Sequence, residues 1–403
     1  MYLKSKQMPT SWQANTMLVT SPRRIYFDER ASDAVASIAE EKEATRILIV
    51  TDRVIESTSY FKEVVDELRK SGILVEIFSG VEPEPSFETA KQIGITASRH
   101  KAELIVAIGG GSVIDAAKGG YILYEKPDIV LEELNPFEPL KLGGKALLVA
   151  IPTTCGTGSD ASFGIVLTKI ENNIKRKLAL AHHEIVPYAS ILDIRFLETL
   201  PSHLVKNTSL DALSHAIEAY VAVTANIYTD AISEKVVETI ILELPSALSR
   251  RSQSSLKSLH ISATMAGIAF TNAGLGLAHA IAHTIGPILG LHHGLAVSIA
   301  LPYVVGFNAA NSSEAEEKYS SLFKKIRAVA QNTSSSKLDE FLREFYKKIQ
   351  HPLSLREVVE IGREKWESIV NTISEKVLED PSIAFNPVTV SSEEVKKILL
   401  EMY

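Results

Sequence analysis

The first half of the chain alternates short apolar runs with segments of helical period. Four runs rich in β-branched residues predict buried strands, at residues 46–52, 74–80, 104–110 and 146–154. Between them, residues 59–72 and 86–100 place apolar side chains at helical spacing, and Gly72 follows the first helix as a cap. Strands that alternate with helices in this way predict a parallel sheet covered by helices on both faces.

After about residue 197 the strand pattern stops, and helical period continues to the end of the chain. Residues 229–248, 313–331 and 354–374 are the clearest examples. The 403 residues are too many for one ordinary domain. We therefore expect an α/β domain over residues 1–196 and an all-α domain over residues 197–403.

Composition and charge exclude several classes of protein. Hydrophobic residues make up 45% of the chain and charged residues 23%, so neither a disordered nor a fibrous protein is expected. The formal net charge is −7 and the chain has no basic run, so a basic surface that would bind nucleic acid is not expected. The single cysteine, Cys155, rules out an internal disulfide framework and fits a cytoplasmic location. The N-terminal residues lack the apolar segment of a secretory signal.

One long segment, residues 258–313, contains no Asp, Glu, Lys or Arg. It is long enough to span a membrane, for which about 20 apolar residues suffice. However, glycine, asparagine, proline and histidine interrupt it, and no stretch of it is uniformly apolar. We expect buried helices of a large core, and no membrane partner.

One carboxylate and four imidazoles in the second half predict a metal site: Asp211, His215, His279, His283 and His293. Asp211 and His215 are four residues apart in a stretch without helix breakers, so both side chains leave the same face of one helix. His279 and His283 repeat this spacing, and His293 follows a Gly/Pro turn expected over residues 286–290. Any one of these histidines, taken alone, would be better explained as a hydrogen-bonded core residue. The set indicates a metal, because the apolar neighbours of Asp211 make an unpaired charge there expensive to bury.

Two polar loops in the first half predict a nucleotide site. The strand at residues 104–110 leads into Gly109, Gly110, Gly111 and Ser112, and a helix follows. The glycines let the backbone approach a ligand, and the helix N-terminus offers free N–H groups to a pyrophosphate. A simple tight turn is the alternative. The second loop brings small hydroxyl side chains to the carboxyl end of the sheet, where α/β proteins bind nucleotides: Thr153, Thr154, Thr157 and Ser159.

Asp52 closes the strand at residues 46–52 and is placed to accept hydrogen bonds from a ribose 2′-hydroxyl. Because its charge would repel a 2′-phosphate, we expect NAD as cofactor, with NADP as the alternative. A cap on the following helix or turn is the other interpretation of Asp52. In the usual dinucleotide fingerprint the acidic residue follows the glycine loop, whereas here it precedes that loop.

With these residues assembled, the chain resembles the iron-containing (group III) alcohol dehydrogenases, which are related more distantly to glycerol dehydrogenases and dehydroquinate synthases. Four motifs in family order carry the resemblance, at residues 109–119, 151–160, 211–220 and 279–294. The resemblance implies a Rossmann-like dinucleotide-binding N-terminal domain and a helical metal-binding C-terminal domain. It also implies a cleft between them for NAD(P) and one divalent metal, Fe(II) or Zn(II). We further expect a homodimer or a higher homo-oligomer.

The resemblance also assigns roles to residues. It implies four metal ligands, Asp211, His215, His279 and His293. His293 is preferred to its neighbour His292 because the family's ligand directly precedes a glycine, here Gly294. His283 matches a further family histidine near the nicotinamide and the substrate, and we expect it to be catalytic.

Three other positions concern the cofactor. Lys177 resembles a family lysine near the cofactor, although an exposed, solvated lysine is the alternative. The chain departs from the family at Asp160, where Glu is usual, and at Cys155, where Ala is frequent. Both departures concern the shape of the nicotinamide pocket and neither touches the metal ligands.

The function that the resemblance implies is that of an alcohol dehydrogenase or aldehyde reductase, which transfers hydride between NAD(P)(H) and a small alcohol or aldehyde. The metal would polarise a carbonyl or acidify an alcohol, and His283 would move the alcohol proton. A glycerol or glycerol-1-phosphate dehydrogenase is the alternative among oxidoreductases. A lyase like dehydroquinate synthase would need Lys and Arg for a substrate phosphate, and residues 258–313 contain none.

Overall fold

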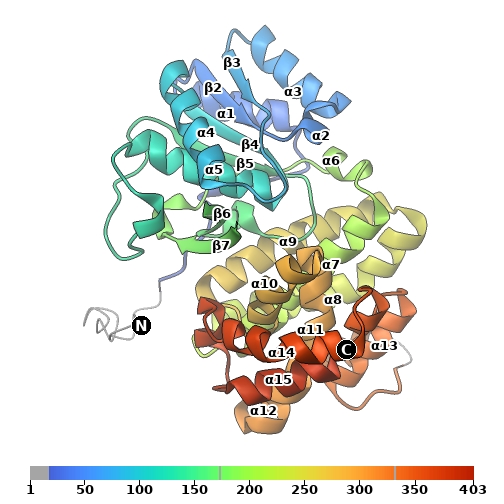
Figure 1. The fold of residues 1–403 in the computed structure, drawn as a ribbon. Coiled ribbons are helices and arrows are strands. Elements are labelled where there is room, and N and C mark those ends of the chain that lie inside the picture. The colour runs from blue at the N-terminus through green and yellow to red at the C-terminus, as the bar shows by residue number, and fades with distance from the viewer. Residues whose placement is uncertain (1–17, 172–173, 331–332) are drawn as a thin grey trace.

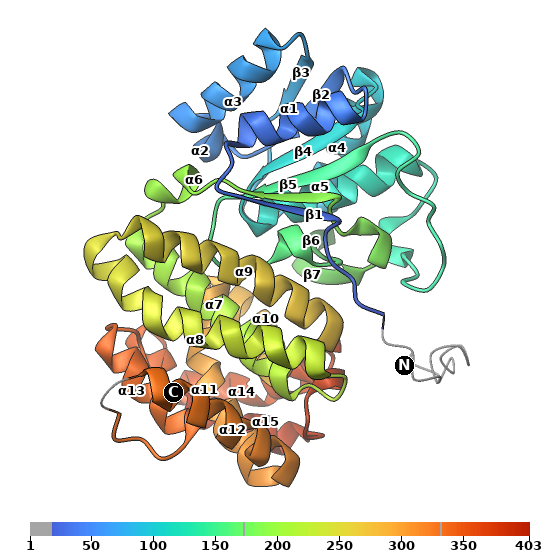
Figure 2. The same ribbon diagram turned by 180° about the vertical axis from the view of Figure 1, so that it is seen from behind.

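The computed structural model describes residues 18–171, 174–330 and 333–403. Figures 1 and 2 show an α/β half, built from the first part of the chain, above a half made of helices. The fold class expected from the sequence is confirmed, because a parallel sheet with helices precedes a mostly helical C-terminal part. The domain boundary between residues 196 and 197 stays a prediction.

The main sheet contains six strands: β1 Arg24–Phe27, β2 Arg46–Val50, β3 Leu74–Phe78, β4 Leu104–Gly109, β5 Leu147–Pro152 and β8 Ala189–Leu192. Their order is β1-β8-β5-β4-β2-β3, and every neighbouring pair is parallel. The four runs expected to be strands are β2 to β5. The sequence pattern did not predict β1 and β8, because runs of 4 residues are too short to show a period.

Helices cover both faces of this sheet. They are α1 Ala31–Glu41, α2 Arg53–Glu56, α3 Ser59–Lys70, α4 Phe87–His100 and α5 Gly111–Glu125. Alternate residues of β4 show how the faces are filled. Val106 and Ile108 pack in one cluster with α1 and α3, whereas Ile105 and Ala107 pack in another with α4 and α5. A strand that is buried on both faces needs apolar residues at every position, which explains the unbroken apolar run that predicted it.

A separate antiparallel hairpin, β6 Gly164–Glu171 and β7 Ile174–Ala181, lies beside the main sheet. Side chains of α5 hold its first strand. Oδ2 of Asp115 accepts a hydrogen bond from the backbone N–H of Val166 at 2.9 Å. Nζ of Lys118 donates to the carbonyl oxygens of Ser162 and Gly164 at 2.9 and 2.8 Å. The Lys118 side chain is fully buried, and this burial lowers its pKa to about 8.

The second half is built from the helices α6 Arg195–Glu198, α7 Ser202–Val221, α8 Ile227–Arg250, α9 Gln253–Ala273, α10 Leu277–Leu289, α11 His293–Asn311, α12 Ser313–Val329, α13 Leu338–Lys348, α14 Arg363–Val377 and α15 Ser392–Glu401. Helix α7 packs against α8, α9 and α11, and α10 packs against α11. This arrangement brings the two histidine-bearing segments, α10 and the start of α11, against the helix that carries Asp211 and His215.

The structure differs from the sequence prediction at two helix ends. Helix α10 continues through Gly286 and Pro287 and ends at Gly290, whose φ is +67°. The turn expected over residues 286–290 is therefore confined to Gly290. A proline in the last turn of a helix removes one hydrogen bond but does not end the helix. The helix expected over residues 354–374 begins only after Gly362, and a short 3₁₀ turn, Leu355–Glu357, precedes it.

Most of the uncharged segment forms α9, α10 and α11. Within the described residues, α11 is long and apolar enough to cross a membrane, but 61% of its apolar window is buried inside the protein. Helices α9 and α10 pass the same test only when they are joined, and the chain bends by 111° between them. Burial of this kind is typical of a core helix.

Candidate metal and cofactor site

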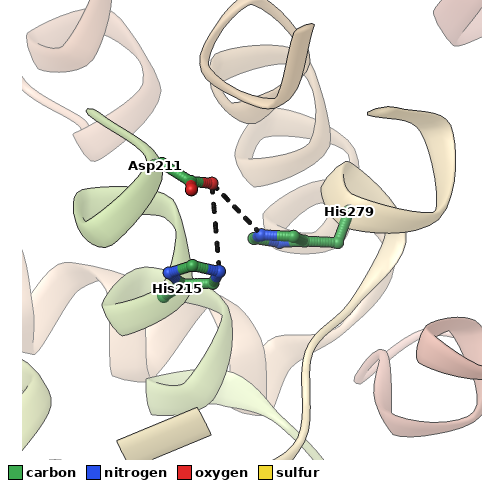
Figure 3. Close-up of side chains that lie close together, drawn as sticks. All are labelled: Asp211, His215 and His279. Atoms are coloured by element: carbon green, nitrogen blue, oxygen red, sulfur yellow. Dashed lines mark ion pairs between the residues drawn. The ribbon is translucent and has the colours of Figure 1, made fainter. Parts of the chain in front are cut away.

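One oxygen atom, Oδ1 of Asp211, is the centre of the histidine cluster. The Nε2 atoms of His215, His279 and His293 lie 3.9, 3.6 and 3.5 Å from it. Figure 3 shows Asp211 and His215 on α7 and His279 reaching them from α10. His293 is the first residue of α11. The structure thus brings together the four side chains for which the resemblance implied a metal.

The spacing of these atoms fits a shared cation better than direct hydrogen bonds. Separations of 3.5 to 3.9 Å exceed the range of an ordinary N–H···O bond. Ligands about 2.1 Å from a tetrahedral metal ion are themselves separated by about 3.4 Å. Ligand atoms of Asp211, His215 and His279 also lie within 4.8 Å of one another.

The burial of these side chains also indicates a bound cation. Asp211, His215 and His279 are each at most 4% exposed, and neither Oδ1 of Asp211 nor Nε2 of His279 has a hydrogen-bond partner. A buried carboxylate oxygen without a partner is costly unless a cation or a strong donor faces it. The residues therefore fit a divalent metal ion.

Asp211 and His215 have the protonation states that a metal ion needs. Burial lowers the pKa of His215 to about 4, so this imidazole is neutral near pH 7 and offers a lone pair. Burial alone would raise the pKa of Asp211, but the surrounding imidazoles hold it well below its usual range. Burial also disfavours charge on His279, but the carboxylates of Glu218 and Asp211 outweigh it and raise the pKa of His279 to about 9. This imidazole must therefore release a proton when a metal ion binds at pH 7.

Glu218, which the sequence analysis did not single out, orients His279. Its Oε2 accepts a hydrogen bond from Nδ1 of His279, and its Oε1 accepts from the backbone N–H of Ala278 at 2.7 Å. With Nδ1 engaged, Nε2 of His279 is left facing Asp211. Carboxylates that fix a metal-ligating histidine in this way are a common feature of metal sites.

His283 lies next to the cluster but points its Nδ1 elsewhere. That atom is 2.9 Å from Oδ2 of Asp380, a residue far along the chain at the start of the 3₁₀ turn Pro381–Phe385. The His283 ring stacks on His293 with 5.1 Å between ring centroids. Burial opposes ionisation of Asp380, but the hydrogen bond with His283 lowers its pKa to about 2. The carboxylate therefore stays charged and holds the imidazole at the edge of the site.

The two polar loops lie side by side, because β4 and β5 are parallel neighbours with Gly109 paired to Pro152. A Cβ atom on Gly111 would lie 2.8 Å from the Thr157 side chain, and one on Gly110 would meet Thr154 at 3.4 Å. A side chain on Gly109 would also overlap Val113. Close packing thus requires glycine at 109 and 111, whereas a Cβ at position 110 would make an ordinary contact. Gly110 is the N-cap of α5, whose N-terminus faces the same edge.

Several hydroxyls of these loops already have protein partners. Ser159 is buried and its hydroxyl bonds to Asp115 and Lys118, while Ser112 donates to the carbonyl of Pro83. Thr153 is buried as well. Among the hydroxyl side chains proposed for the cofactor, Ser112, Thr154 and Thr157 are partly exposed, and of these three Ser112 already donates its proton to the protein.

Asp52 and Lys177 both have structural partners. Asp52 follows β2, the neighbour of β4, and its Oδ1 caps α2 by accepting from the N–H groups of Val54 and Ile55 at 2.8 and 2.9 Å. The cap considered for Asp52 is therefore present, and it occupies one of the two carboxylate oxygens. Lys177 is exposed on β7 and forms an ion pair with Glu84 at 3.0 Å.

Comparisons with known proteins identify the family of the chain. The family model for iron-containing alcohol dehydrogenases matches residues 22–194, and the model for the C-terminal part of the same family matches residues 205–403. The chain belongs to the iron-containing alcohol dehydrogenase family. The family expected from the sequence motifs is thereby confirmed.

Relatives in this family match along nearly the whole chain. An alcohol dehydrogenase of Thermococcus barophilus is 36% identical over 380 residues, which are 93% of this chain and 96% of the relative. The NADPH-dependent butanol dehydrogenase of Clostridium saccharobutylicum is 33% identical over 391 residues, 96% and 98% of the two chains. The structure of an iron-containing alcohol dehydrogenase from Thermococcus thioreducens superposes with a TM-score of 0.86 at 32% identity, and covers 96% of this chain and 99% of that one.

Family membership establishes the chemistry at a general level. The protein is an oxidoreductase that acts on alcohols and aldehydes, with a metal and NAD(P) as cofactors. The activity expected from the sequence is confirmed to this extent.

Proposed function

We propose that Asp211, His215, His279 and His293 hold one divalent cation, Fe(II) or Zn(II). The observation that carries this assignment is the convergence of three imidazole nitrogens within 3.9 Å of a single buried carboxylate oxygen. Imidazole and carboxylate ligands suit both metals, and zinc binds such sites more tightly in the usual affinity order. The metal found in the protein thus depends on supply as well as on the ligands.

For the cofactor, we propose that Gly109, Gly110 and Gly111, with the partly exposed Thr154 and Thr157, receive NAD. Ser112, Thr153 and Ser159, in the same loops, and Lys177, on β7, complete the proposed cofactor-binding set. The cap formed by Asp52 leaves its charge at the carboxyl end of β2, where it would disfavour a 2′-phosphate. This supports NAD over NADP, although the butanol dehydrogenase relative is named as NADPH-dependent.

The proposed substrate is a small neutral alcohol or aldehyde. Residues 258–313 contain no Lys or Arg to bind a phosphate. The ring of Phe270 lies beside that of His215, with 4.5 Å between the ring centroids. The butanol dehydrogenase relative supports an aliphatic substrate. A glycerol dehydrogenase is the remaining alternative, and glycerol tests it directly.

His283 is the proposed proton carrier. A bound divalent cation would supply Lewis acidity to the alcohol or carbonyl oxygen, and the nicotinamide would exchange the hydride. The protein's part is to orient the reactants and to move the hydroxyl proton. His283 is 25% exposed and held by Asp380, so its other nitrogen can exchange a proton between the site and solvent.

A panel of alcohols and aldehydes tests the proposal. It would contain short aliphatic alcohols, glycerol and the matching aldehydes, each assayed with NAD(H) and NADP(H) on protein reconstituted separately with Fe(II) and Zn(II). We expect activity on short aliphatic substrates and a higher kcat/KM with NADH than with NADPH. Preference for glycerol, or a strong preference for NADPH, would contradict the substrate or the cofactor assignment respectively. The homo-oligomeric state and the cytoplasmic location stay predictions.

A further inference from the structure

Helix α9 contacts the second cofactor loop along one face. His260, Thr264 and Gly267 are separated by four and three residues, so they lie on the same side of the helix. Nε2 of His260 lies 3.0 Å from the carbonyl oxygen of Pro152, at the end of β5. Figures 1 and 2 show α9 along the top of the helical half, next to the α/β half.

Asp160, at the far end of the second cofactor loop, forms hydrogen bonds with both the α/β half and the helical half. It belongs to the 3₁₀ turn Ser159–Ala161 and is only 1% exposed. Its Oδ2 accepts a hydrogen bond from the Thr264 hydroxyl at 2.7 Å and from the Ser190 hydroxyl at 2.6 Å. Ser190 lies in β8 of the main sheet, so one carboxylate oxygen joins the sheet, the loop and α9. Hydrogen bonds to a charged acceptor are among the stronger ones in proteins.

Between these contacts the backbones of the loop and of α9 touch. A Cβ atom on Gly267 would lie 2.5 Å from the carbonyl oxygen of Gly158, and one on Gly158 would lie 2.5 Å from Cα of Gly267. Gly158 also has a φ of +60°, which favours glycine. Neither position has room for a side chain, so the loop is pressed directly against the helix.

The same helix reaches the metal centre about one turn later. The ring of Phe270 lies against that of the proposed ligand His215, with 4.5 Å between the centroids. On its other side the loop meets the glycine cradle, where Thr157 packs beside Gly111. A short length of α9 therefore spans the distance from the cofactor loop to the metal centre.

We propose that Thr264 and Gly267 are positioning residues that set the distance between the nicotinamide and the substrate at the metal centre. This inference rests on the proposed cofactor and metal sites. Reacting atoms must come within about 3–3.5 Å of each other, and a misplacement of about 1 Å costs about 10²-fold in rate. A change at the contact between α9 and the loop should therefore lower kcat. It should spare the affinity for NADH alone, because both cofactor loops belong to the α/β half.

The first test is Gly267→Ala. The added methyl group must move the loop by at least about 0.5 Å to relieve its contact with Gly158. We expect kcat to fall by about tenfold or more. The deuterium isotope effect on kcat, measured with a deuterated alcohol, should rise because hydride transfer becomes slower. The Kd for NADH, from fluorescence titration, should stay within twofold of the parent, and metal content should be unchanged.

The second test uses threonines of α9 and does not depend on fitting a larger residue. Thr264→Val removes the hydrogen bond to Asp160 and should lower kcat several-fold, whereas Thr264→Ser keeps the hydroxyl and should restore it. Thr271→Val is the matched control, since Thr271 is buried in the same helix and its hydroxyl has no hydrogen-bond partner. We expect the control to match the parent in kcat and in KM.

Two results would overturn the inference. One is an unchanged kcat and isotope effect in both Gly267→Ala and Thr264→Val. The other is a loss of NADH affinity as large as the loss of kcat, which would mean that α9 maintains the cofactor site itself. An inactive parent would contradict the proposed function, and this inference with it, whereas an active parent with unaffected variants contradicts this inference alone.

Discussion

Glu218 and His279 lie on different helices, and the carboxylate of Glu218 accepts a hydrogen bond from Nδ1 of His279. The bond fixes the tautomer of the imidazole and turns Nε2 towards Asp211. Glu218 is itself 3% exposed, and it also accepts from the first N–H groups of α10. One side chain thus sets both the position of the helix and the orientation of its ligand.

Glu218→Gln should weaken metal binding. The amide can still accept from the N–H of Ala278, but its NH₂ group would face Nδ1 of His279 and favour the wrong tautomer. We expect the metal affinity to fall by about 10- to 100-fold, as for other changes to residues that orient ligands. Retention of metal during dialysis against a chelator measures the effect. Glu243→Gln, which alters a carboxylate bonded to Ser255 instead, is the control.

Removal of a ligand should remove the metal. In His279→Ala and in His293→Ala we expect loss of bound metal and of activity, while the folded protein still binds NADH through the α/β half. Elemental analysis and NADH fluorescence give the two readouts. His100→Ala, which changes a partly exposed histidine at the end of α4, should keep its metal. Full occupancy in both ligand variants would disprove the assignment.

His283→Ala should act on proton transfer and leave the metal in place. We expect kcat to fall by about 10²-fold and the pH–rate profile to change shape, because loss of a general acid or base has this effect. Asp380→Asn should lower kcat less, since the amide still holds Nδ1 of His283 but lacks the charge. If His283→Ala lost metal as completely as His279→Ala, His283 would be a ligand.

Asp52→Asn separates the two roles of this residue. Asparagine caps a helix about as well as aspartate, so the N–H groups of Val54 and Ile55 keep their acceptor. The negative charge is lost, and we expect kcat/KM for NADPH to rise relative to that for NADH. Asp52→Gly should shift the ratio in the same direction at a cost of a few tenths of a kcal/mol in stability. A parent that already strongly prefers NADPH would show that the position is misread.

Acid should destabilise the protein through His351. Burial, with a smaller effect of Lys206, lowers the pKa of this histidine to about 3, against about 6.5 in the unfolded chain. Between these values the unfolded state binds more protons, so stability rises with pH and is lost as the pH falls from about 6.5 to about 3. The expected loss from pH 7 to pH 5 is about 2 kcal/mol. Urea unfolding at both pH values should show a smaller loss in His351→Gln.

Helical spacing predicts that Asp211 and His215 share one face of a helix, as the structure has them. The choice of His279 and His293 as the other proposed ligands comes from the family resemblance. The position of Glu218 in the sequence also indicates that it lies near the site. It lies seven residues after Asp211, on the same face of α7, but a glutamate there is usually read as a solvated helix residue. Asp380 carried no such signal, because its contact with His283 joins segments 97 residues apart and arises only from tertiary packing.

Some strands could be predicted from the sequence and others could not. β2, β4 and β5 are buried along most of their length, and their apolar runs predict them directly. β3 lies at the edge of the sheet and is only partly buried. β6 and β7 pair with each other outside the main sheet, so neither needs such a run. The sequence pattern also extended α14 across Gly362, because the period of apolar residues continues there although the backbone does not.

Two side chains of α5 attach the β6–β7 hairpin to the α/β half. An isolated pair of strands is barely stable in water. Here Asp115 and Lys118 take the place of a third strand, since they bond to backbone groups of Val166, Gly164 and Ser162. These bonds join the hairpin to α5 and not to the strands of the main sheet. A change at Asp115 or Lys118 should therefore loosen the hairpin while the hydrogen bonds of the six-stranded sheet stay intact.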